Sequence, residues 1–229
     1  MLHLLTPQNI LPQDHEQAVL VARIWTDGLG PTLVRVREDH IYDLSHLAAT
    51  SAQLLEMADP VGTVREYGGP HIASTAAVLA NSAQDQRNPD EPWFLAPCDL
   101  QAIKAAGVTF VASMLERVIE EQARGDAGRA EAVRRSVVGV IGDNLRSIKP
   151  GSAQAAQLRE VLIRQGVWSQ YLEVGIGEDA EIFTKSQPMS AMGVGADIGL
   201  HPKSVWNNPE PEIVQIGRAS CRERVSLVV

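Results

Sequence analysis

The strongest candidate for chemistry in the sequence is a pair of glutamates, Glu210 and Glu212, separated by one residue. In an extended strand alternate side chains share a face, so the two carboxylates would converge on one place. Two like charges that close are unfavourable unless a proton or a cation lies between them. The pattern therefore predicts a hard divalent ion, Mg²⁺ or Mn²⁺, bound by both carboxylates. The alternative is an ordinary exposed strand face. Pro209 and Pro211 favour a shaped site or an edge strand, because they remove two backbone donors.

A second candidate pair, Glu181 and Lys185, lies in the segment AEIFTK. Ile182 and Phe183 favour a strand, in which residues 181 and 185 again share one face. The alternative is a surface ion pair of little energetic value.

The histidines show no spacing typical of a metal site, and none stands in sequence beside a candidate nucleophile. They are His3, His15, His40, His46, His71 and His201.

Several elements must position these residues. Residues 19–46 contain apolar alternation on both sides of the turn sequence DGLGP, which predicts a small β-meander. Thr50 or Ser51 is a suitable N-cap for a following helix. Residues 84–92, QDQRNPDEP, are polar and rich in proline, and we interpret them as a linker between two domains.

The second half of the chain has a different pattern, with helices first and strands afterwards. Apolar stripes predict helices over residues 99–107, 113–125 and 152–166, and strands over residues 168–177, 180–185 and 206–214. Ser152 is the expected cap of the third helix, and Gly166 its end. This order predicts an α+β fold.

Composition excludes some classes of function. The 229 residues carry a net charge of −8, and the acidic residues are spread along the chain, which argues against a nucleic-acid partner. No apolar run is long enough to cross a bilayer, and no signal peptide opens the chain. Cys98 and Cys221 make no disulfide framework. We expect a cytoplasmic protein with neither a nucleic-acid nor a membrane partner.

Three segments resemble the fumarylacetoacetate hydrolase family. They are residues 95–128, beginning LAPCDLQAIKAAG, then GVWSQYLEVGIGEDAEIFTK at 166–185, and WNNPEPEIV at 206–214. The similarity extends over residues 16–214 and is closest to the branch of dehydratases that act on 2-keto-3-deoxy-D-xylonate or -arabinonate. The hydrolase branch carries a histidine and glutamate after its LAP-type strand, whereas this chain has AAGVTFVASMLERVIEE there, without histidine.

The resemblance implies a reaction and a set of roles. Water would be removed from a 2-keto-3-deoxy-D-pentonate to give 2-oxoglutarate semialdehyde, with Mg²⁺ or Mn²⁺ on Glu210 and Glu212. Glu181 would transfer a proton at C3 or to the departing C4 hydroxyl, and Lys185 would stabilise the charge that develops. Members of the family are commonly homo-oligomers that act on small 2-keto acids. The alternatives are a hydrolase or decarboxylase of acylpyruvate-type diketo acids, and an inactive, non-catalytic remnant.

The end of the sequence departs from the family pattern. The resemblance implies a third metal ligand, an aspartate, and the rest of a curved β-roll after residue 214. Residues 215–229 instead carry three Arg and one Glu, and resemble a translated sequencing adapter. We therefore expect an N-terminal domain and linker over residues 1–92, a truncated catalytic domain of the β-roll type over 93–214, and a non-native tail over 215–229.

Overall fold

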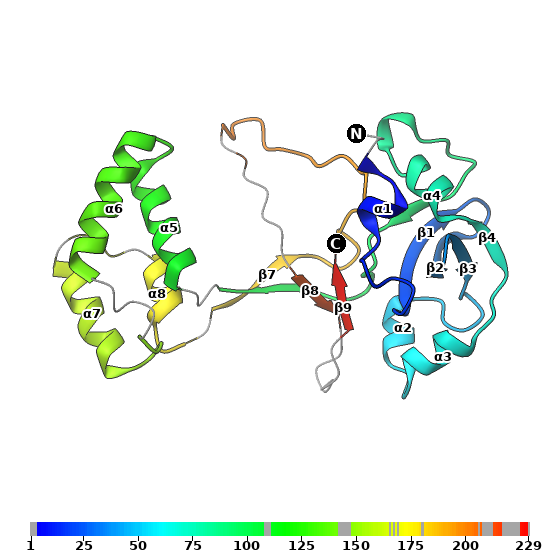
Figure 1. Cartoon of the computed structure of the whole chain (residues 1–229), viewed down its shortest axis with the longest axis horizontal. Helices are drawn as coiled ribbons and strands as arrows, with labels where there is room; N and C mark the ends of the chain where they lie inside the picture. Colours follow the sequence, from blue (N-terminus) through cyan, green and yellow to red (C-terminus); the bar gives the residue numbers. More distant parts are fainter. Residues whose placement is uncertain are drawn as a thin grey trace. The chain divides into compact units, whose positions relative to one another are not determined.

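The structure is a computed structural model. It describes residues 4–107, 111–141, 148–164, 166, 168, 170–179, 181–205, 207, 213–216 and 225–228. The chain forms two compact units, the first from Met1–Ile103 with Ser186–Val229 and the second from Lys104–Lys185. Figure 1 shows the elements of both units. The expected mixture of helices and antiparallel sheet is confirmed, whereas the β-roll stays a prediction.

The first unit is built on a five-stranded antiparallel sheet with the order β4-β3-β2-β1-β5. Its strands are β1 (Leu20–Thr26), β2 (Gly30–Arg37), β3 (His40–Asp43), β4 (His71–Ser74) and β5 (Trp93–Leu95). The β1–β2–β3 meander confirms the prediction from residues 19–46. Gly28 and Gly30 have φ of 75° and 78°, so glycine suits the turn between β1 and β2.

Short helices cover both faces of this sheet. They are α1 (Pro7–Ile10), α2 (Ser51–Leu55), α3 (Pro60–Glu66), α4 (Thr75–Asn81) and the 3₁₀ turn η2 (Gln84–Gln86). Val34 and Val36 of β2 pack toward Val78 of α4, whereas Leu33 packs in a separate cluster with Leu54 of α2. Because successive strand residues point to opposite faces, β2 is buried on both sides.

The predicted linker, residues 84–92, lies inside the first unit and does not join two units. The side-chain amide of Asn81 donates to the carbonyl oxygens of Asn88, Glu91 and Pro92 at 2.9–3.2 Å. Its oxygen accepts from the N–H of Asn88 at 2.7 Å. The Asn81 side chain thus holds the second half of a segment that its composition indicated as a linker. The compact units and the predicted domain ranges therefore do not coincide.

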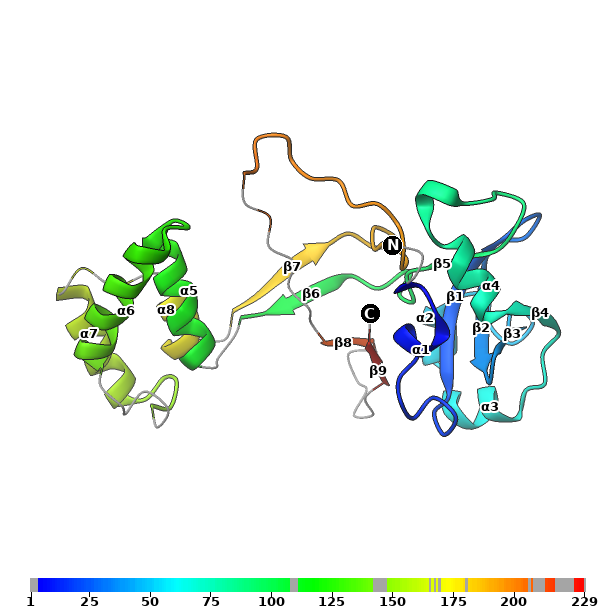
Figure 2. The ribbon, with the colours of Figure 1, turned by 45° about the horizontal axis from the view of Figure 1, so that its top comes forward.

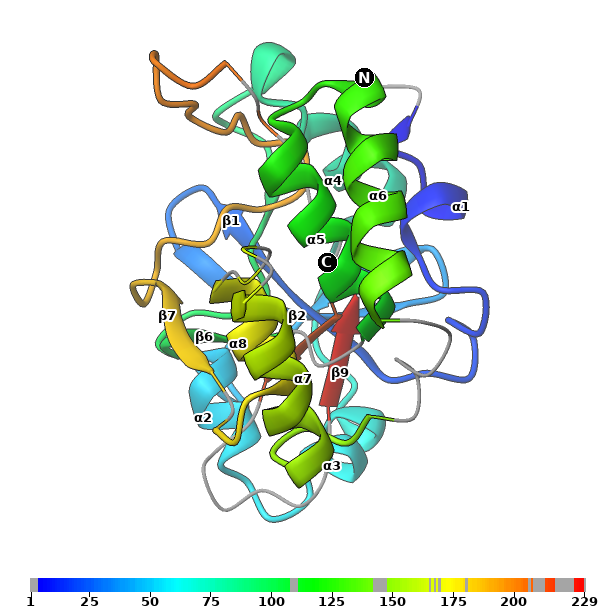
Figure 3. The same ribbon diagram turned by 90° about the vertical axis from the view of Figure 1, so that its left-hand side faces the viewer.

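In the described residues of the second unit, helices α5 to α8 accompany most of a two-stranded sheet. Its elements are β6 (Ile103–Ala106), α5 (Val111–Ala123), α6 (Ala127–Ile141), α7 (Ala153–Arg164), α8 (Gln170–Ile176) and β7 (Ile182–Ser186). Figure 2 shows β6 and β7 side by side, and Figure 3 shows the group of helices. The Ser152 hydroxyl accepts from the N–H of Ala155 at 3.2 Å, and Gly166 has φ of 71°. The predicted start and end of α7 are therefore confirmed.

Two predictions for this unit were wrong. Residues 103–106 form strand β6 instead of the expected helix over 99–107, because they pair with the distant strand β7. Residues 170–176 form helix α8 instead of the expected strand over 168–177. Leu172 and Ile176, four residues apart, lie on one helix face and are buried against Val118 of α5 and Leu162 of α7.

The last described strands are β8 (Ile213–Ile216) and β9 (Val225–Val228), which pair antiparallel, with Ile213 opposite Val228. Strand β9 falls in residues 215–229, whose foreign origin stays a prediction. Among the described residues, no helix has the length and apolar character needed to cross a bilayer.

Candidate functional site

Glu181, the predicted proton-transfer residue, stands immediately before β7 in the second unit. Its carbonyl oxygen accepts a hydrogen bond from the N–H of Gly107 at 2.8 Å, which ties it to the end of β6. A methyl group on Gly107 would lie 2.2 Å from Val174 Cγ1 and 3.2 Å from Glu181 Cβ. The absence of a side chain at position 107 therefore lets the end of β6 lie close to Val174 of α8.

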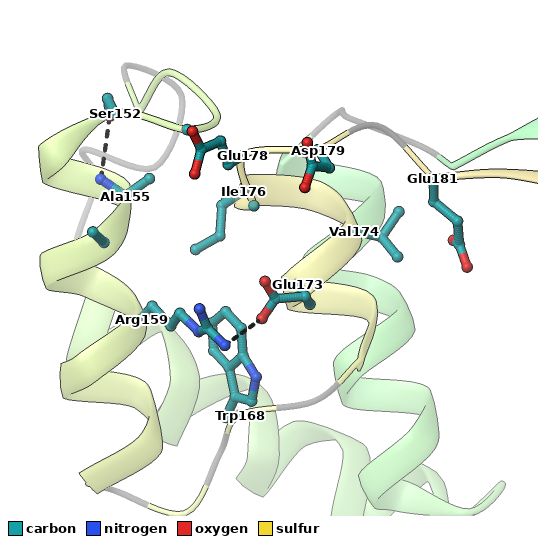
Figure 4. Close-up of a pocket in the computed structure, with 13 residues that line it drawn as sticks. Ser152, Ala155, Arg159, Trp168, Glu173, Val174, Ile176, Glu178, Asp179 and Glu181 are labelled. Atoms are coloured by element: carbon teal, nitrogen blue, oxygen red, sulfur yellow. Dashed lines mark hydrogen bonds and ion pairs between the residues drawn. The ribbon is translucent and has the colours of Figure 1, made fainter.

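Glu181 is one of the residues that line a cavity of about 660 Å³, and its side chain lies at the edge of the labelled group (Figure 4). Helix α7 and the residues before it supply one wall, including Ser152 and Arg159. Helix α8 and the turn after it supply the other, including Glu173, Glu178 and Asp179. This volume is within the range of small-molecule sites.

Charge in the cavity is strongly unbalanced. Its described lining residues include four carboxylates and a single cation, Arg159. Arg159 Nη2 lies 3.0 Å from the carboxylate of Glu173, and the guanidinium lies 5.3 Å from the ring centre of Trp168. The remaining carboxylates, on Glu178, Asp179 and Glu181, are exposed. An anionic substrate would therefore need a cation to enter this cavity favourably.

Lys185 lies on β7 four residues after Glu181, as the strand prediction required, and is exposed. Its ammonium is 5.6 Å from the centre of the Phe183 ring. Among the ion pairs of the described residues, none joins Glu181 to Lys185. Lys185 does not belong to the described lining of the cavity.

Glu210 and Glu212, the predicted metal ligands, lie outside the described residues. Strand β8 begins at Ile213, directly after them. Elsewhere in the part of the chain that the structure describes, no three His, Cys, Asp or Glu side chains form a group suited to a metal ion.

Sequence reasoning missed the other residues of the cavity. Arg159 and Glu173 are brought together from separate helices, and Trp168 lies between those helices in the chain. The strand predicted over 168–177 would have pointed alternate residues to opposite faces, so it concealed this grouping. No spacing in the sequence signals it.

Comparison with known proteins identifies no relative. No protein-family model matches the chain. Neither a curated protein nor a solved structure matches it.

Proposed function

We propose that the chain belongs to a metal-dependent hydro-lyase of the fumarylacetoacetate hydrolase type. The proposed substrate is a 2-keto-3-deoxy-D-pentonate, which loses water to give 2-oxoglutarate semialdehyde. The observation that carries the proposal is the position of Glu181, a carboxylate in the wall of a cavity, four residues ahead of Lys185 on an exposed strand. The resemblance of AEIFTK and WNNPEPEIV to the family supports the choice of reaction.

The donor types suit the implied metal. Two carboxylates, Glu210 and Glu212, would hold Mg²⁺ or Mn²⁺, which prefer oxygen ligands. Within the second unit, the cavity lining carries more carboxylates than cations, so a keto acid that binds there needs a positive partner. When bound, the ion would supply Lewis-acid polarisation of the 2-keto group.

The chain's own residues would move the proton and stabilise charge. Loss of water requires a proton to leave C3 and the C4 hydroxyl to depart with a proton. Glu181 serves one of these two transfers, since a positioned carboxyl group can act as base or acid. Lys185, on β7 and four residues after Glu181, would contribute a positive charge that stabilises negative charge developing on the keto acid.

Replacing Glu181 with glutamine is the direct test. Steady-state rates with 2-keto-3-deoxy-D-xylonate, in the presence of Mg²⁺, should fall by about 10²- to 10⁴-fold in Glu181→Gln, whereas Mg²⁺ binding should persist. Glu178→Gln is the matched control, because it removes the same charge from the same cavity. An equal loss in both variants would indicate a general electrostatic effect and would contradict the specific role of Glu181.

The same assay also distinguishes the two alternative functions. Cleavage of an acylpyruvate in place of dehydration would support the hydrolase or decarboxylase alternative. An absence of turnover, with no rise in melting temperature on addition of Mg²⁺ or Mn²⁺, would support a non-catalytic chain, because a ligand that binds the folded state must stabilise it.

A further inference from the structure

Two histidines far apart in sequence meet on the sheet of the first unit. His40 opens β3 and His71 opens β4, and His40 Nδ1 lies 3.1 Å from His71 Nε2. The ring centres are 4.9 Å apart, with an angle of 72° between the planes. His71 is opposite Tyr42 in the strand register, and His40, two residues before Tyr42, shares its face. Both imidazoles are exposed, so an ion from solvent can reach them.

The backbone around the two imidazoles is well fixed. Hydrogen bonds join the N–H of Asp43 to the carbonyl of Pro70 and the N–H of Thr75 to that of Asp39, both at 2.8 Å. The Tyr42 ring lies beside both imidazoles, with its centre 6.4 Å from that of His40 and 5.8 Å from that of His71. The two histidines therefore lie on paired strands instead of on a loop. Less conformational entropy is lost when they bind an ion.

We propose that His40 and His71 together chelate one late transition-metal ion, of the class of Zn²⁺, Ni²⁺ or Cu²⁺. Imidazole is the side chain that these ions favour. Metal–nitrogen bonds of about 2.0–2.1 Å place two nitrogens on one ion roughly 2.9–3.4 Å apart, for angles between octahedral and tetrahedral. The observed 3.1 Å separation falls in this range without any movement of the strands.

The proton balance of binding is simple. The ion takes the place of the proton shared between the two nitrogens, so that proton moves to the outward nitrogen of its own ring, His40 Nε2 or His71 Nδ1. Two neutral imidazoles release no proton when they bind the ion. If one ring is protonated, one proton is released, so binding weakens in acid.

The surroundings set the expected strength and selectivity. The guanidinium of Arg37 lies 5.8 Å from the centre of the Tyr42 ring, and its Nε is 3.6 Å from the carboxylate of Glu38, which offsets its charge. Within the described residues, no third His, Cys, Asp or Glu completes the site, so water would fill the remaining positions. Mg²⁺ prefers oxygen ligands and should not compete. This site thus differs in its ligands and in its preferred metal from the one proposed on Glu210 and Glu212.

Calorimetric titration of the untagged chain with Ni²⁺ or Zn²⁺ tests the proposal. We expect one ion per chain, with binding weakened more than about tenfold in His40→Ala and in His71→Ala, because a single imidazole loses the chelate. His46→Ala is the control, since His46 is an exposed histidine of the same unit. Wild-type binding that matches either single variant, or that is lost in the control, would overturn the proposal.

Hydrogen exchange supplies a second readout. The metal should bridge the edge strand β4 to β3 and slow exchange of the amides where Ile41 pairs with Ala73. Mg²⁺ at the same concentration should leave these amides unchanged. The same slowing by Ni²⁺ in His71→Ala would show that the ion acts elsewhere, and would also overturn the proposal.

Discussion

Arg23 and Asp99 form a buried ion pair between β1 and the segment that follows β5, with Arg23 Nε 3.5 Å from Asp99 Oδ2. Both side chains are less than a tenth exposed. Arg23 also donates to the carbonyls of Ala96 and Cys98, at 3.0 and 3.1 Å. Asp99 accepts from the N–H groups of Ser51 and Ala52, at 2.7 and 3.2 Å, and so binds the start of α2. One carboxylate therefore connects a helix, a strand and a loop.

Replacing Asp99 with alanine should destabilise the first unit by about 3–5 kcal/mol, because it leaves Arg23 buried without its counter-charge. Urea unfolding followed by the fluorescence of Trp25 and Trp93 measures the change. Glu38→Gln is the control, since Glu38 pairs with Arg37 at a similar 3.6 Å but in solvent. That pair should contribute no more than about 1 kcal/mol. Equal losses in the two variants would contradict the importance of burial.

The carboxylate of Asp99 should make the stability of the first unit depend on pH. Burial by itself would raise the pKa of Asp99, but the N–H groups of Leu100 and Ser51 and the guanidinium of Arg23 lower this pKa below its ordinary value. The folded state therefore holds this proton less tightly than the unfolded state does. The stabilisation is present above the unfolded pKa of about 3.9 and is lost as pH falls through the folded pKa.

Urea midpoints measured from pH 7 down to pH 3 test this dependence. The wild-type midpoint should fall in the acidic part of the range, and Asp99→Asn should start lower and fall less steeply. Parallel curves for the two proteins would show that other carboxylates cause the acid sensitivity.

Gly107→Ala should damage the proposed site through sterics. The new methyl group would lie 2.2 Å from Val174 Cγ1, so α8 or the strand end must move, at a cost of roughly 1–3 kcal/mol. Val174→Ala in the same chain should restore part of that loss, which a double-mutant cycle on urea unfolding would reveal. A cycle without coupling would contradict the close approach.

Gly139→Ala is the matched control for a glycine-to-alanine change. Gly139 lies in α6, where a methyl group would meet nothing within 4 Å. The substitution should stabilise the helix by up to about 1 kcal/mol, because alanine is the better helix former. Gly107→Ala should thus lower the free energy of unfolding, whereas Gly139→Ala should raise it.

Asn81 should control the order of residues 84–92. Asn81→Asp keeps an acceptor for the N–H of Asn88 but replaces the amide that donates to three carbonyls. Limited proteolysis should therefore cut this loop faster in the variant than in the wild-type chain. Gln86→Ala, at an exposed position of the same loop, should leave the rate unchanged. Equal rates for the wild type and Asn81→Asp would contradict the role of Asn81.

Much of the local structure could be predicted from the sequence. The meander of β1 to β3 follows from alternating apolar residues around a glycine-containing turn, and the Thr50 and Ser152 caps follow from side chains that bond backbone groups three residues away. Strand β7 was also predicted. These features depend on interactions within a few residues of each other, which a sequence pattern records directly.

Only the tertiary structure decided the features that depend on distant residues. Strand β6 exists because it pairs with β7, and α8 is a helix because Leu172 and Ile176 pack against α5 and α7. The grouping of Arg159 with Glu173, of Arg23 with Asp99 and of His40 with His71 each joins separate elements. The residue types determine which contacts are chemically possible. Which of them form is settled by the packing of the whole chain, because the free energy of burial depends on neighbours that sequence spacing does not specify.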